Sequence, residues 1–367
     1  MIAGFASVRV LIAPDSFKGS ASAAAVAAAL AAGWLAVRPG DQVTRLPLAD
    51  GGEGTLDVLA ATVPGARWRR ARVTGPGGGP VHCRWLQLPG QVAVVELARA
   101  SGLPLLAHPD PMAAHTIGLG EVLGRALDAG ATRILVGLGG SASTDGGTGA
   151  LAALGARFLD ASGQPLPPGG GALATLAGAD LRRLRPPPPD GVTCLADVTA
   201  PLLGPRGAAA VYGPQKGANA AQIARLEAGL ARLAEVLGGD PGAPGAGAAG
   251  GTGYGLSAAW GAGFAPGAVE LSRLAGLDRA LAGADLVITG EGRFDPTSLT
   301  GKTTGTVLAA AAAAGIPAAL VAGQVSGDPP EGIRVIALAG LAGGPAPALA
   351  SPRRWLRQAA RHLAMSS

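Results

Sequence analysis

The sequence has little cysteine, few aromatic side chains and little charge. Two cysteines, Cys83 and Cys194, occur among 367 residues and form no C-x-x-C pair, so we expect neither a disulfide framework nor a structural zinc site. Aromatic residues make up 3% of the chain, and no basic cluster is interleaved with them, which argues against nucleic-acid binding.

Signals for export and for membrane insertion are also missing. No basic segment precedes the first apolar run. A long uncharged and largely apolar stretch, residues 303–327, is rich in alanine and glycine and is broken by Pro317. We therefore expect a cytoplasmic protein without a membrane partner.

The chain is instead rich in apolar and small residues. Apolar residues make up 48% and charged residues 14%, which is typical of a globular protein. The length predicts about two domains. The 61 glycines and 30 prolines follow no collagen-like period. Charged residues that interrupt this background are therefore the most informative, and the net charge of +5 suits small anionic substrates.

Short apolar runs alternate with helical stretches near both ends of the chain. These runs lie at residues 8–13, 43–48, 285–289, 318–322 and 334–339. Such a pattern predicts a parallel sheet that is covered by helices on both faces.

The middle of the chain has a different pattern, in which residues 66–98 alternate in polarity between short turns and predict an antiparallel meander. The expected fold class is α/β, with two α/β domains. We predict a Rossmann-like parallel-sheet domain from residues 1–65 and 281–367, and a second mixed α/β domain, residues 66–280, inserted into it. Residues 160–191 and 238–253 are expected to be loops.

Polar and charged residues concentrate in six loops, most of which follow a predicted strand. Because ligands bind at the carboxyl ends of strands in open α/β sheets, we expect these residues to share a site. The candidates are Asp15, Ser16, Lys18, Asp50, Glu53, Gly139, Gly140, Ser141, Asp197, Lys216, Glu291, Arg293, Asp295 and Lys302.

This set contains the groups that phosphoryl transfer requires. The loop "GLGGSASTDGGTG" (137–149) opens a predicted helix, and helix N-termini favour phosphate. Lysines can neutralise phosphate charge, and carboxylates can hold Mg²⁺. The stretch "LADGGEGT" (48–55) places Asp50 and Glu53 among three glycines, so by itself it fits a phosphate cradle, a metal site or a tight turn.

Other classes of site fit the sequence less well. "GKTTG" (301–305) resembles the end of a P-loop, but Pro296 stands where the first glycine of that motif belongs. No G-x-G-x-x-G pattern follows the first strand, which argues against a classical dinucleotide site. Ser141 has no evident histidine partner, which argues against a serine hydrolase.

Five motifs, taken in order, resemble the bacterial-type glycerate kinase family. They are "IAPDSFKGSASA", "PLADGGEGT", "GLGGSASTDGGTGAL", "ADVTAPLLGPRGAAAVYGPQKGA" and "GADLVITGEGRFDPTSLTGK". The resemblance implies an ATP-dependent kinase of D-glycerate with two α/β domains and Mg²⁺, closer to the branch that phosphorylates the 2-hydroxyl. The chain departs from the family pattern around Ser143 and at Ala200, but Asp145 and Asp197 are kept.

The resemblance and the chemistry together give a hypothesis for each role. Asp197 is expected to position the acceptor hydroxyl or take its proton, with Asp295 as the second candidate, and Lys18 to serve the substrate or phosphoryl charge. Substrate contacts are assigned to Arg293, Asp15, Ser16 and Glu291, nucleotide contacts to Gly139, Gly140, Ser141, Lys216 and Lys302, and Mg²⁺ to Asp50 and Glu53.

Three alternatives stay open at this point. The chain can be a glycerate 3-kinase, a kinase of another small hydroxy acid, or a non-catalytic sensor of organic acids on the same fold. The expected partners are D-glycerate and a nucleotide, and the chain is expected to be a monomer or a homodimer.

Overall fold

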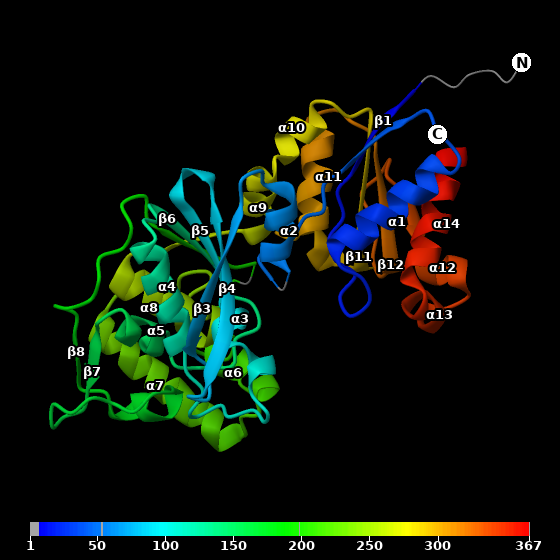
Figure 1. Ribbon diagram of the computed structural model, residues 1–367. Coiled ribbons are helices and arrows are strands. Elements are labelled where there is room, and N and C mark those ends of the chain that lie inside the picture. The colour runs from blue at the N-terminus through cyan, green and yellow to red at the C-terminus, as the bar shows by residue number, and fades with distance from the viewer. Residues whose placement is uncertain (1–6, 53, 198, 367) are drawn as a thin grey trace, which may run out of the picture. The chain divides into compact units, whose positions relative to one another are not determined.

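The computed structural model describes residues 7–52, 54–197 and 199–366, which form two compact units (Figure 1). The first unit comprises residues 1–50, 57–63 and 266–367, and the second comprises residues 51–56 and 64–265. Each unit contains its own sheet and its own hydrophobic core. The α/β fold class is therefore confirmed.

The first unit is built on a five-stranded parallel sheet with the strand order β13-β12-β11-β1-β2. The side chains of β1 alternate between the two faces of this sheet, as the pleat of a strand requires. Val10 and Ile12 pack under α1 and α14, whereas Leu11 packs under α10 and α11. Helices thus cover both faces. The strands are β1 (Arg9–Ile12), β2 (Gln42–Arg45), β11 (Leu286–Phe294), β12 (Ala318–Val325) and β13 (Arg334–Ala337).

The helices of this unit begin and end at recognisable signals. Ser22 caps α1 by accepting a hydrogen bond from the backbone N–H of Ala25. The helices are α1 (Ala23–Leu35), α9 (Gly267–Ala275), α10 (Leu277–Leu281), α11 (Thr303–Ala313), α12 (Leu338–Ala342), α13 (Pro345–Ala350) and α14 (Pro352–Met365), while α2 (Thr55–Thr62) has residues in both units.

The second unit is built on a six-stranded mixed sheet with the strand order β10-β9-β6-β5-β4-β3. Strands β3, β4 and β5 pair antiparallel and form the predicted meander, and the remaining neighbours pair parallel. The strands are β3 (Arg67–Thr74), β4 (Pro80–Leu88), β5 (Val92–Glu96), β6 (Arg133–Gly137), β9 (Val192–Leu195) and β10 (Gly263–Ala265).

The helices of the second unit pack around this sheet. They are α3 (Ala98–Ser101), α4 (Ile117–Asp128), α5 (Thr148–Ala153), α6 (Ala208–Tyr212), α7 (Ala220–Leu237) and α8 (Ala248–Trp260). Among the described parts of the chain, no helix combines the length and the apolar character that a bilayer crossing requires.

Two predicted loops contain regular structure. The segment 160–191 includes strand β8 (Gly178–Asp180), which pairs antiparallel with β7 (Arg157–Leu159). The predicted loop over 238–253 overlaps the start of α8, but residues 249–251 have positive φ and are not helical, so the prediction misses helix only after Gly251. Glycine adopts positive φ readily, which suits this segment to a turn.

The boundaries between the two units differ from those predicted from the sequence. Residues 266–280, expected in the inserted domain, belong to the first unit because Ala275 and Leu277 are buried in a cluster with Leu11 and Val287. Hydrophobic contact with the parallel sheet, rather than position along the chain, assigns α9 and α10 to this unit.

Candidate active site

The sheet of the first unit has a topological switch point between β1 and β11. From β1 the chain runs through α1 to β2 on one side, whereas from β11 it runs through α11 to β12 on the other. The loops that leave the carboxyl ends of β1 and β11 therefore diverge, and ligands of open α/β sheets bind in the crevice between such loops.

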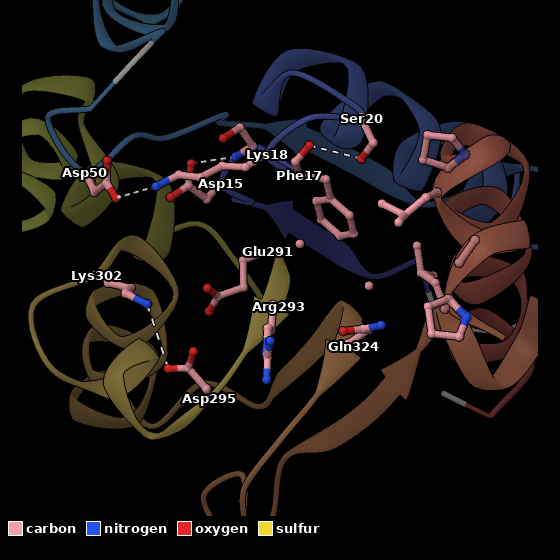
Figure 2. A pocket seen from close by; sticks show the side chains of 18 residues that line it. Asp15, Phe17, Lys18, Ser20, Asp50, Glu291, Arg293, Asp295, Lys302 and Gln324 are labelled. Carbon is pink, nitrogen blue, oxygen red and sulfur yellow. Dashed lines mark hydrogen bonds and ion pairs between the residues drawn. The ribbon is translucent and has the colours of Figure 1, made fainter. Parts of the chain in front are cut away.

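A pocket of about 360 Å³ lies at this switch point (Figure 2). Its volume falls in the range of about 300–1,000 Å³ that is typical of small-molecule sites. All of its lining residues belong to the first unit. It brings together eight residues that the sequence predicts for the site: Asp15, Ser16, Lys18, Asp50, Glu291, Arg293, Asp295 and Lys302.

Asp15 and Asp50 face the same part of the pocket. Burial raises the pKa of Asp15 to about 6, and the charge of Asp50 adds to the rise, while the backbone N–H of Ser16 opposes it. Lys18 Nζ lies 4.0 Å from Asp50 Oδ2, but the lysine side chain is 83% exposed. An exposed pair of this kind contributes little stability, so Lys18 can turn towards a ligand.

Glu291 and Arg293 lie on strand β11 rather than in a loop. The sequence predicts a strand only to residue 289, but β11 and β12 stay paired as far as Phe294 and Val325. Residues two apart on a strand share a face, and both of these side chains line the pocket.

Gly292, between these two residues, allows the loop after β1 to lie close to strand β11. A Cβ at Gly292 would lie 3.3 Å from Phe17 Cα and 3.4 Å from Lys18 N, tighter than most side chains tolerate. A larger residue at this position would push Lys18 away from β11.

The carboxylate of Asp295 is held by Thr297 and faces Lys302. Its Oδ1 accepts hydrogen bonds from Thr297 N at 2.9 Å and from Thr297 Oγ1 at 2.5 Å, and Lys302 Nζ lies 3.8 Å away. The Thr297 hydroxyl, above all, lowers the pKa of Asp295. A carboxylate with a lowered pKa is a poor proton acceptor, which counts against Asp295 as the catalytic base.

A polar cluster lies behind the pocket wall, at the start of α11. Glu291 Oε1, Thr303 Oγ1 and Thr304 Oγ1 are buried and make no hydrogen bond of normal geometry within the described chain. Burial raises the pKa of Glu291, and the nearby hydroxyls of Ser298 and Thr304 oppose this. Buried polar atoms of native proteins usually have a partner, so this cluster suits a ligand, an ion or ordered water.

The other side of the pocket is apolar. Figure 2 shows Gln324 between Arg293 and a group of apolar side chains, with the ring of Phe17 above. We call this part the apolar end and define it by Phe17, Leu338, Pro345, Ala348, Leu349 and Pro352. None of these residues, nor Gln324, is predicted from the sequence, although Gln324 stands just beyond the apolar run 318–322.

The predicted glycine loop belongs to the second unit and follows β6. Gly139 and Gly140 are exposed, whereas Ser141 is buried and its hydroxyl bonds within the protein, to the carbonyls of Ser143 and Ala249. The backbone N–H of Ala142 donates to Ser101 O, and that of Gly146 to Gly250 O. Only the first part of this loop therefore stays a candidate for phosphate binding.

Asp145 occupies the N–H groups in the rest of this loop. It is fully buried, and its carboxylate accepts hydrogen bonds from the backbone N–H groups of Thr116, Gly147 and Gly149 and from the Thr116 hydroxyl. The expectation that the start of this helix is open to a phosphate is wrong for these amides, because a carboxylate of the protein already holds them.

Lys216 braces the same loop from inside. Its side chain is 2% exposed, and Nζ donates a hydrogen bond to Ser143 O. A Cβ at Gly250, which has φ +66°, would lie 2.9 Å from this Nζ. Burial lowers the pKa of Lys216 to about 8, while Asp145 opposes the change.

This buried lysine should make stability depend on alkaline pH. Between pH 8 and 10.5 the unfolded chain binds the Lys216 proton more tightly than the folded chain, so this group makes the free energy of unfolding rise with pH. Lys216→Met removes the contribution. Urea unfolding from pH 7 to 10.5 should show wild type gaining relative to this variant, and a constant difference would contradict the assignment.

Two further candidates lie outside the pocket's lining. Asp197 is exposed and follows strand β9 in the second unit. Glu53 lies outside the described residues. Within residues 7–52, 54–197 and 199–366, no three histidine, cysteine, aspartate or glutamate side chains form a metal cluster.

Fold and pocket together define an α/β protein with a pocket of small-molecule size at a switch point, lined by carboxylates and cations. The chain belongs to the glycerate kinase family, since the model of that family matches residues 10–366. It is therefore an enzyme and a kinase, and the resemblance noted in the sequence is confirmed.

Known proteins agree with this assignment. The chain is 42% identical to glycerate 2-kinase of Escherichia coli (strain K12) over 80% of each chain, and 41% identical to glycerate kinase of Bacillus subtilis (strain 168) over 88% of this chain and 86% of that one. A crystal structure described as "putative glycerate kinase 2" of Salmonella typhimurium LT2 matches with a TM-score of 0.84 and 37% identity over 98% of both chains.

Proposed function

We propose that the enzyme transfers the γ-phosphoryl group of ATP to the 2-hydroxyl of D-glycerate, with Mg²⁺, and releases 2-phosphoglycerate. The observation that carries this proposal is the pocket at the switch point, where a guanidinium, two lysines and several carboxylates line one cavity. The name of the Escherichia coli relative, glycerate 2-kinase, supports the choice of hydroxyl.

Arg293 is our candidate for the carboxylate of glycerate. Its side chain is exposed and lines the pocket. Nη2 makes a long hydrogen bond, 3.5 Å, to Ser326 Oγ. A guanidinium fork matches a carboxylate with two parallel hydrogen bonds. Asp15, Ser16 and Glu291 line the same cavity and can accept hydrogen bonds from the two hydroxyls of glycerate.

Phosphoryl transfer depends on positioning and on positive charge that stabilises the transferring group, rather than on covalent catalysis by the protein. Lys18 and Lys302 line the pocket and are the candidates that supply it, with Gly139 and Gly140 of the second unit as further phosphate contacts. Mg²⁺, when bound, neutralises charge on the phosphate oxygens. It usually takes only one or two carboxylates from the protein, so Asp50 with Asp15 or Glu53 fits it without a larger cluster.

Asp197 remains our first candidate for the group that positions the hydroxyl or accepts its proton. Asp197 is exposed and follows the carboxyl end of the parallel strand β9, which is where ligands of open α/β sheets bind. Asp15 is the second candidate, because a half-buried carboxyl with a pKa of about 6 accepts a proton well near neutral pH.

The direct test is an assay with ATP, Mg²⁺ and D-glycerate, in which NMR identifies the product. We expect ADP formation that depends on glycerate, and 2-phosphoglycerate as the product. Exclusive formation of 3-phosphoglycerate would show the 3-kinase alternative instead. Glycerate binding without any ADP formation would favour the sensor. Cytoplasmic location and assembly as a monomer or homodimer stay predictions.

A further inference from the structure

The apolar end of the pocket does not match glycerate. Each of the three carbons of glycerate carries oxygen, so the molecule has no apolar surface to bury. The polar side of the cavity already offers charged partners for its carboxylate and hydroxyls. Small-molecule sites place apolar walls where the ligand is apolar, so this end of the pocket requires a different ligand.

The apolar end combines a buried floor with an exposed apolar edge. Leu338 and Ala348 form a buried floor, at 1% and 5% exposure, whereas the neighbouring Leu349 is 61% exposed. These residues come from α12 and α13, which follow strand β13 of the same sheet. Leu349 thus adds exposed apolar surface at the edge of a cavity, and a ligand with an apolar face would cover it.

Gln324 adds a directional group to this apolar surface. It lies at the carboxyl end of β12, is half-buried, and is placed between Arg293 and the apolar side chains (Figure 2). A carboxamide offers one acceptor and a pair of donors on neighbouring atoms. This combination pairs with the edge of adenine, which presents an amino group beside a ring nitrogen.

We propose that the apolar end binds the adenine base of the nucleotide, with Gln324 reading the edge of the base. A base has two apolar faces, which apolar side chains can cover. The phosphates would extend towards Lys18 and Lys302, which line the polar side of the same cavity. The inference rests on the proposed function in one respect, since that function requires a nucleotide.

The test measures binding rather than turnover. Dissociation constants are determined by calorimetry for ADP with Mg²⁺, for pyrophosphate with Mg²⁺, and for D-glycerate. The variants are Gln324→Leu and Leu349→Asp, and both positions are accessible enough to tolerate change. Val269→Asp is the matched control, because Val269 is 51% exposed in the same unit but does not line the pocket.

We expect each pocket variant to weaken ADP binding about tenfold, which is typical of losing one specific contact to a ligand. Pyrophosphate has no base, so its binding should stay within about twofold. The control should bind all three ligands like wild type. In wild type, amide hydrogen exchange across residues 338–352 should slow with ADP but not with pyrophosphate, and this measurement needs no variant.

Three results would overturn the proposal. They are unchanged ADP binding in both variants, equal weakening of ADP and pyrophosphate, and weakening of glycerate alone. The proposed function fails separately: if wild type forms no phosphoglycerate but ADP still protects residues 338–352, the base site stands and the choice of acceptor substrate is wrong.

Discussion

Replacing Asp197 by asparagine should lower kcat at least about a hundredfold, the usual scale for a group that takes part in proton transfer. Asparagine keeps the shape of the side chain but cannot accept a proton. Because phosphoryl transfer depends on positioning as well as on basicity, we expect the effect in kcat more than in the KM for ATP. Steady-state kinetics with D-glycerate and ATP measure both.

Asp240→Asn is the matched control for this variant. Asp240 is an exposed aspartate of the same unit. Its carboxylate accepts a hydrogen bond from the backbone N–H of Gly242. Its kcat should equal that of wild type. If Asp197→Asn folds normally and keeps kcat within about threefold of wild type, Asp197 is not the base.

In that case Asp15→Asn decides whether the base lies in the pocket itself. A hundredfold loss in Asp15→Asn beside a small loss in Asp197→Asn would move the proton acceptor to the half-buried carboxyl after β1.

Replacing Asp145 by alanine should lower the free energy of unfolding by about 3–5 kcal/mol, the scale for removing one member of a buried ionic group. Three backbone N–H groups and one hydroxyl lose their acceptor at once. Lys216 also loses the opposite charge that favours its protonated form. Urea unfolding followed by circular dichroism measures the change.

Asp160→Ala serves as the control for stability. Asp160 accepts hydrogen bonds from Ser162 N and Gln164 N in an exposed turn, so we expect a loss below about 1 kcal/mol. Similar effects of the two substitutions would contradict the role of Asp145 as the internal acceptor of the loop. Asp145→Asn should fall between them, because the amide oxygen still accepts hydrogen bonds but carries no charge.

The structure places one of the two carboxylates of "LADGGEGT" at the pocket. Asp50 lines the pocket and its Oδ2 lies 4.0 Å from Lys18 Nζ, while its role as a metal ligand stays a prediction. Glu53 lies outside the described residues, and its role as a metal ligand stays a prediction. The wider glycine loop after β6 turned out to be closed over most of its length by Asp145 and Lys216.

The α/β class, the parallel sheet near both ends of the chain, the meander and eight polar residues of the pocket are all predictable from the sequence. These features depend on local patterns: apolar runs specify buried strands, and charges that interrupt an alanine- and glycine-rich background stand out.

Three features are visible only in the tertiary structure. They are the assignment of helices to each unit, the buried positions of Asp145 and Lys216, and the apolar end of the pocket. Leucine, proline and alanine at residues 338–352 look like ordinary helix and turn residues in the sequence. They line the pocket only because α12 and α13 pack against β12, and such a contact between separate segments leaves no local pattern.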